Sequence, residues 1–83
     1  MKLTFKLYAG LARYLPAEAV ENAVSIEVAD SATPFDIMDQ FQVPYAEAHL
    51  VLRNGLYIEP EDRDKPVLSD GDVLALWPPV AGG

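Results

Sequence analysis

Apolar and polar residues alternate along two stretches near the start of the chain, 2–7 and 24–28. Alternation with a period of two is typical of strands that bury one face, so both stretches are predicted to be strands, the second antiparallel to the first. A third apolar stretch, 73–77, predicts the last strand. We expect its pairing to end at Trp77, because proline cannot donate to a strand ladder and two prolines follow.

A helix is predicted to begin at Pro34, at the first helical position, with Thr33 as its N-cap. Asp36 is three residues after the cap, where an acid suits the positive end of the helix dipole. Helical spacing places several apolar residues on one stripe, which predicts packing on a sheet; they are Phe35, Ile37, Met38 and Phe41. Pro44 marks the end of this element.

Asn54-Gly55 lies between two apolar runs, 50–53 and 56–58, and predicts a hairpin. A type I′ turn needs positive φ at both central residues, which Asn and Gly tolerate. A short helical turn is expected over 9–15, and Leu68 is expected to fill the core.

The predicted order is strand, strand, helix, strand, strand, strand. One helix covers one face of a mixed sheet of four to five strands, which is an α+β arrangement. The last strand fits beside the first only if the two run parallel, with the helix in the connection between them. Order and size fit a ubiquitin-like β-grasp fold, with residues 1–77 as the domain and 78–83 as an extended C-terminal tail.

The composition of the chain excludes several classes of site and of binding partner. The chain has 83 residues, enough for one small domain. It contains no cysteine, which excludes disulfides, zinc–thiolate sites and cysteine nucleophiles. A formal charge of −7 argues against nucleic acid and anionic membranes. No apolar run approaches the length of a membrane span and the start is unlike a signal peptide, so we expect a cytoplasmic protein.

The tail carries the candidate chemistry. Its extended exit is set by prolines, and its last two residues have no side chains to keep the terminal carboxylate out of a narrow channel. The residues are Pro78, Pro79, Val80, Ala81, Gly82 and Gly83. The alternative is an inert, frayed terminus.

No other candidate site survives. His49 is the only histidine, so no metal site is expected. Asp70-Gly71-Asp72 lacks the length and the later glutamate of a calcium loop. No glycine-rich phosphate loop is present, so we expect no bound cofactor, and any ATP must be held by a partner.

The stretch 68–83, with its Asp-Gly-Asp turn and Pro-Pro-Val-Ala-Gly-Gly end, resembles the C-terminal signature of the MoaD/ThiS sulfur-carrier family. Residues 2–12 resemble the opening strand and turn of its MoaD branch, the molybdopterin synthase small subunits, and 52–55 resemble the central strand and hairpin turn. The Pro-Pro form of the tail is closer to MoaD than to ThiS.

This resemblance implies a carrier without catalytic residues of its own. A MoeB-like, ubiquitin-activating-enzyme-like protein adenylates Gly83 with ATP, and a persulfide from a sulfurtransferase then leads to a thiocarboxylate there. The thiocarboxylate donates sulfur on a MoaE-like large subunit during molybdenum or tungsten cofactor synthesis. Gly82 is required by the width of the channel that the tail enters.

A docking face is predicted from strand alternation. If Leu74 and Leu76 point at the helix, other apolar residues of that strand point away from it and form a partner surface. The predicted members are Val51, Arg53, Val73, Ala75 and Trp77. The alternative is that Trp77 only packs against the first strand or the tail. The acids of the 59–64 loop add contacts to a basic partner, or form a solvated loop.

Two other functions stay open. One is a protein modifier joined to lysines through Gly83, as ubiquitin is. The other is a binding module with an inert tail. Among sulfur carriers, thiamine, cysteine and tRNA thiolation pathways are alternatives to the molybdopterin pathway.

Overall fold

The computed structural model describes residues 1–79. This part of the chain forms five strands, one α-helix and three short 3-10 helices. In chain order they are β1 (Lys2–Leu7), η1 (Ala9–Tyr14), β2 (Ala23–Glu27), α1 (Pro34–Gln40), η2 (Tyr45–Glu47), β3 (Leu50–Arg53), β4 (Leu56–Tyr57), η3 (Pro60–Asp62) and β5 (Val73–Trp77).

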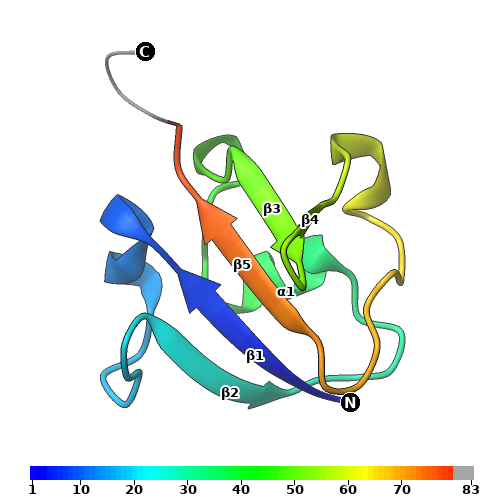
Figure 1. Ribbon diagram of the computed structural model, residues 1–83, viewed down its shortest axis with the longest axis horizontal. Helices are drawn as coiled ribbons and strands as arrows, with labels where there is room; N and C mark the ends of the chain where they lie inside the picture. Colours follow the sequence, from blue (N-terminus) through cyan, green and yellow to red (C-terminus); the bar gives the residue numbers. More distant parts are fainter. Residues whose placement is uncertain (80–83) are drawn as a thin grey trace.

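The strands form one mixed sheet in the order β2-β1-β5-β3-β4 (Figure 1). β5 runs parallel to β1 at the centre, and the other neighbouring pairs are antiparallel. The predicted parallel pairing of the first and last strands is therefore confirmed. It places the end of β5 between two neighbours, β1 and β3.

The core lies between the sheet and α1, which is behind the sheet in Figure 1. Alternate residues of the central strands are fully buried, and these are Leu3, Phe5, Leu7, Leu74 and Leu76. Leu68, in the long connection before β5, is buried as predicted. No helix among residues 1–79 is both long enough and apolar enough to cross a membrane.

α1 begins as predicted but is shorter than the apolar stripe suggested. The Thr33 side chain accepts a hydrogen bond from the Asp36 N–H, and the Asp36 carboxylate accepts one from the Thr33 N–H. The helix ends at Gln40. The helix therefore has only about two turns. Phe41 is the C-cap of the helix, and the Phe41 ring stacks on the Phe5 ring with 4.9 Å between ring centroids.

The β3–β4 hairpin turns at Asn54 and Gly55, as predicted. Their φ angles are +50° and +83°, and Arg53 pairs with Leu56 across the turn. This is the local geometry that a two-residue type I′ turn requires.

We predict that Thr33→Ala lowers the free energy of unfolding by about 1 kcal/mol, because it removes the oxygen that accepts the Asp36 N–H. Urea denaturation followed by circular dichroism measures the change. Ser31→Ala is the control, since the exposed Ser31 makes no side-chain hydrogen bond in the described chain. Equal losses in the two variants would contradict the role of the cap.

Candidate functional site

The tail leaves the sheet at the end of β5. Strand pairing ends at Trp77, opposite Leu50 of β3, as predicted. Pro78 is half-buried and Pro79 is exposed. Val80, Ala81, Gly82 and Gly83 lie outside the described residues, so their predicted roles stay predictions. We call Trp77, Pro78 and Pro79 the tail root.

The backbone at the end of β5, where the tail root begins, is held from both sides. On the β1 side, the Tyr8 N–H donates to the Leu76 carbonyl oxygen over 3.2 Å. On the β3 side, the His49 N–H donates to the Trp77 carbonyl oxygen over 2.9 Å. The last carbonyl before the prolines therefore has a fixed partner. His49 itself is exposed.

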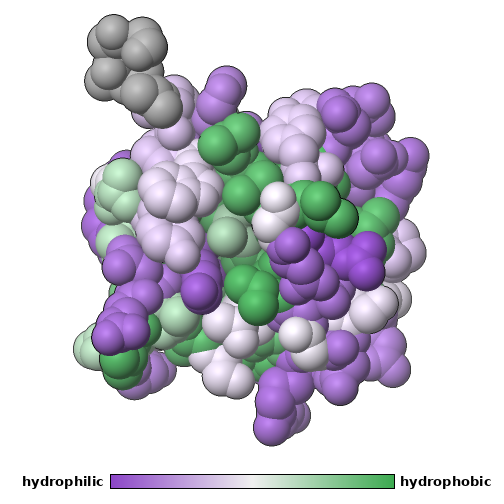
Figure 2. All heavy atoms as spheres, viewed as in Figure 1, coloured by the Kyte–Doolittle hydropathy of each residue, from purple (hydrophilic) through white to green (hydrophobic). Residues whose placement is uncertain are grey.

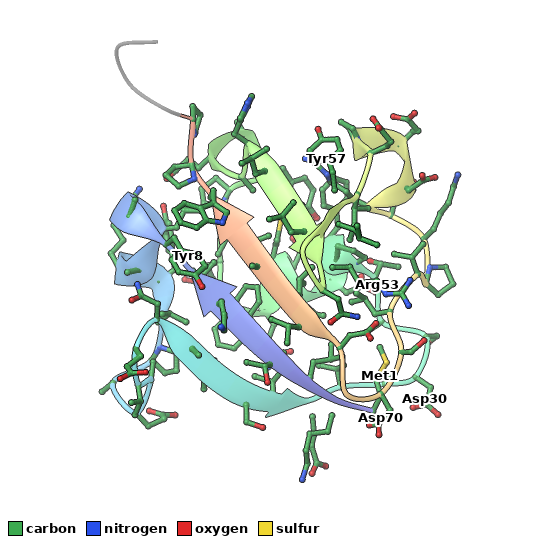
Figure 3. The ribbon with its side chains drawn as sticks, in the orientation of Figure 1. Met1, Tyr8, Asp30, Arg53, Tyr57 and Asp70 are labelled. Atoms are coloured by element: carbon green, nitrogen blue, oxygen red, sulfur yellow. The ribbon has the colours of Figure 1, made fainter. Side chains whose placement is uncertain are left out.

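The side chain of Trp77 is held as well. Its indole stacks on the Tyr8 ring, with 4.0 Å between centroids and 7° between planes (Figure 3). Trp77 is still 38% exposed. Trp77 therefore packs against the residue that ends the first strand and also presents apolar surface. Its role in partner docking stays a prediction.

Alternation along β5 is as predicted, because Leu74 and Leu76 are fully buried. The predicted position of Val51 and Arg53 on the side of the sheet away from the helix is wrong. Directly paired residues share one face of a sheet. Val51 pairs with Leu76 and is fully buried, and Arg53 pairs with Leu74, so both lie on the helix side.

The β3 residues on the other side are the neighbours of Val51. Leu50 pairs with Trp77 and Leu52 pairs with Ala75. We call the surface formed by Leu50, Leu52, Val73, Ala75 and Trp77 the open face. Figure 2 shows hydrophobic residues gathered over β3 and β5 on this side. An apolar area without a covering helix is a candidate interaction surface, and this one lies next to the tail root.

Asp72 fixes the turn that starts β5. Its carboxylate accepts hydrogen bonds from Arg53 Nε over 2.8 Å, Asn54 Nδ2 over 2.9 Å and the Ser69 N–H over 2.8 Å. The sequence reading recognised only a turn here. The bonds tie the β3–β4 hairpin to the beginning of β5, on the helix side of the sheet.

The environment of Asp72 also changes its acidity. Burial alone would raise the pKa of the Asp72 carboxyl, but it is outweighed by the hydrogen bonds from Asn54, Ser69 and Arg53 and by the Arg53 charge. The pKa of Asp72 therefore lies below its ordinary value. The carboxylate stays ionised over the whole physiological range.

Arg63 was missed by sequence reasoning, which placed it in a charged surface loop. It is only 6% exposed. Its Nε donates to the Ile58 carbonyl oxygen and its Nη2 to the Tyr57 hydroxyl, each over 3.0 Å. The guanidinium thus pins the 59–66 loop under β4. Nothing in the local sequence distinguishes this arginine from a solvated one.

A second polar cluster joins η1 to η2. The Arg13 guanidinium pairs with the Glu47 carboxylate, which also accepts from the Tyr14 hydroxyl. All three groups reach solvent at least in part. Among residues 1–79, no three histidine, aspartate or glutamate side chains gather in a way that could hold a metal ion.

A cleft in the described part of the chain lies elsewhere. It has a volume of about 370 Å³ and lies beside the hairpin and the 59–66 loop. Its walls include Arg53, Tyr57, Ile58 and Val67. Arg53 pairs with Leu74 at the far end of β5 from the tail root, so this cleft is not part of the candidate site.

The model of the ThiS family matches residues 14–83. Among solved structures, SAMP1 of Haloferax volcanii, the small archaeal modifier protein 1, has a TM-score of 0.67 at 30% identity, with 100% of each chain covered. The HVO 2177 protein of the same organism has a TM-score of 0.77 at 24% identity, covering 100% of this chain and 87% of that one. A search of curated proteins found no match.

Molybdopterin-converting factor of Helicobacter pylori, solved as a complex of subunits 1 and 2, gives a TM-score of 0.61 at 23% identity, with 100% of each chain covered. At this identity the similarity shows the fold. Together with SAMP1, it confirms the predicted ubiquitin-like β-grasp architecture.

We predict that Asp72→Asn lowers the free energy of unfolding at pH 7 by about 1–3 kcal/mol, because charge-assisted hydrogen bonds are lost. In the wild type this stabilisation is complete above the unfolded-state pKa of about 3.9 and is lost as the pH falls through the lower folded-state pKa. Urea titrations at a series of pH values should show the difference between the two proteins shrinking as acid is added. Asp64→Asn, at an exposed loop position, is the control. A difference that does not change between pH 7 and pH 3 would contradict the assignment.

Proposed function

Because this chain belongs to the ThiS family of sulfur carriers and ubiquitin-like proteins, we propose that it is a sulfur carrier whose C-terminal Gly83 becomes a thiocarboxylate. The observation that supports this most directly is the tail root. The last strand lies at the centre of the sheet, and the chain leaves it beside an exposed apolar face.

A carboxylate is a poor electrophile, so the proposed chemistry begins by activating the Gly83 carboxylate. The Gly83 carboxylate attacks ATP, which gives an acyl-adenylate and releases pyrophosphate. A persulfide sulfur then attacks the acyl carbon and displaces AMP, which gives an acyl disulfide. A thiol reduces this disulfide and frees the thiocarboxylate, whose sulfur is the nucleophile in the next reaction.

The partners supply what this chain lacks. Nucleotide binding and adenylation belong to a MoeB-like activating protein, and the persulfide belongs to a sulfurtransferase. The folded domain presents the tail and docks, so it acts as a carrier and not as an enzyme. Because its activation uses ATP on a partner protein, we propose that this chain works in the cytoplasm.

We propose the open face as the docking surface. Val73, Ala75 and Trp77 keep their predicted place in it, and Leu50 and Leu52 take the places of Val51 and Arg53. Half-exposed apolar side chains next to the tail allow a partner to bury them while the tail enters its active site.

The acceptor pathway proposed is molybdenum or tungsten cofactor synthesis, with a MoaE-like large subunit as partner. The Pro-Pro-Val-Ala-Gly-Gly end supports it, since this form of the tail resembles MoaD. The Helicobacter pylori complex offers the analogy for such an assembly, a subunit of this fold together with a second subunit.

A second function is favoured by one comparison. SAMP1, a modifier by its name, is 30% identical over the whole of both chains. A modifier shares the activation step and differs in the acceptor, which is a lysine amine. Isopeptide-linked species on immunoblots of cells that express a tagged form would support this function.

We predict that incubation with ATP, the MoeB-like protein and a persulfide donor raises the mass of the intact chain by about 16 units, oxygen exchanged for sulfur. Intact-protein mass spectrometry measures the product. Absence of the gain with the cognate activating protein would refute the proposal.

Two tail variants locate the reaction. Deletion of Gly83 should abolish the mass gain, because the reacting carboxylate is displaced. Gly82→Ala should slow it, because a Cβ widens the segment that must thread into the partner. Full function in the cell after deletion of both glycines would instead support a binding module with an inert tail.

We predict that Ala75→Arg weakens binding to the activating protein at least about tenfold, because it places a charge at the centre of an apolar interface. Isothermal titration calorimetry measures the affinity. Gln40→Arg, an exposed position on α1, makes the same charge change on the other side of the sheet and should bind normally. Equal weakening in both variants would argue against the open face.

A further inference from the structure

The Tyr8–Trp77 stack lies where the tail begins, and no step of the proposed chemistry uses it. We propose that Tyr8 is a positioning residue. By holding the Trp77 indole, it sets the direction in which the tail leaves the sheet. This inference rests on the proposed carrier function, because only a tail that enters another active site needs a fixed direction.

The backbone of Tyr8 is held by two hydrogen bonds, which fix the point from which its ring extends toward Trp77. The Tyr8 N–H donates to the Leu76 carbonyl oxygen, and its own carbonyl oxygen accepts from the Leu11 N–H over 3.1 Å. Leu11 is fully buried. The Tyr8 hydroxyl has no hydrogen-bond partner among residues 1–79. The contribution of Tyr8 therefore comes from its flat ring.

Three constraints meet at Trp77. Its carbonyl oxygen is bonded to the His49 N–H. Because it precedes Pro78, its backbone is restricted to extended conformations. Its indole lies parallel to the Tyr8 ring, at 7° between planes. Of these, only the stack restrains rotation of the side chain, and the indole in turn limits how the strand end can twist.

Small rotations at the tail root matter because the displacement they cause grows with the length of the tail. Residues 78–83 span at most about 20 Å when extended. A twist of about 20° at the tail root would therefore move the far end by several ångström. A reacting group displaced by as little as about 1 Å can lose about a hundredfold in rate.

The main variant is Tyr8→Leu, which keeps apolar bulk and removes the flat ring. Tyr8→Phe keeps the ring and should behave like the wild type. Tyr45→Ala is the matched control. It breaks the other exposed stack, with Phe35, at 3.9 Å between centroids and 8° between planes, and that pair includes no residue of the tail root.

The first measurement needs no partner. Trp77 is the only tryptophan of the chain, so time-resolved fluorescence anisotropy reports on the tail root directly. We expect a larger subnanosecond amplitude in Tyr8→Leu and wild-type behaviour in Tyr8→Phe and Tyr45→Ala. Unchanged anisotropy in Tyr8→Leu would overturn the inference, whatever the partner does.

The second measurement is an adenylation assay with the MoeB-like activating protein and ATP, in which the rate of pyrophosphate release is measured. For Tyr8→Leu we expect kcat to fall at least about tenfold with KM within about twofold of wild type. A raised KM with unchanged kcat would mean direct contact with the partner and would overturn the positioning role. Equal loss in Tyr45→Ala would show a merely structural effect. If the wild type is not adenylated, the proposed function fails, and the anisotropy alone decides whether Tyr8 orders the tail root.

Discussion

The parallel pairing of β1 with β5 is the interaction on which the rest of the structure depends. It brings the start and the end of the described domain together at the centre of the sheet, with Phe5 beside Leu74 and Leu7 beside Leu76. These side chains are fully buried, so the pairing and the core stabilise each other. A strand with neighbours on both sides is the least free to fray, and its end is a stable place for the chain to leave the sheet.

Polar contacts then fix the two ends of β5. At its beginning, Asp72 holds the hairpin through Arg53 and Asn54. At its end, Tyr8 and His49 hold the tail root. Between them, alternation sends one set of side chains into the core and leaves the other set on the open face. One strand thus joins the core, the open face and the tail root.

Much of this could be predicted from sequence because it depends on local periodicity and turn chemistry. The strands, the Thr33 cap, the Asn54-Gly55 turn and the parallel last strand all follow from short patterns and a connection rule. The side of β3 on which Val51 and Arg53 lie was predicted wrongly because it depends on register, and a one-residue shift exchanges the two faces of a strand. Val51 and Leu52 are equally apolar, so composition does not show which of them is buried.

Long-range polar contacts could also not be predicted from the sequence. Arg63 has the local context of a solvated loop residue, and only the folded chain brings the Ile58 carbonyl and the Tyr57 hydroxyl to it. The Tyr8–Trp77 stack likewise joins residues from opposite ends of the chain. The only sequence signal for this stack was the expected parallel pairing of β1, which Tyr8 directly follows, with β5, which ends at Trp77.

The outermost strands bear on how this domain behaves at high concentration. β4 has only two residues, and β2, at the other edge, carries the exposed Glu27. Short or charged edges offer little template for another molecule to add a strand. A small domain with an exposed apolar face can in this way resist edge-to-edge polymerisation.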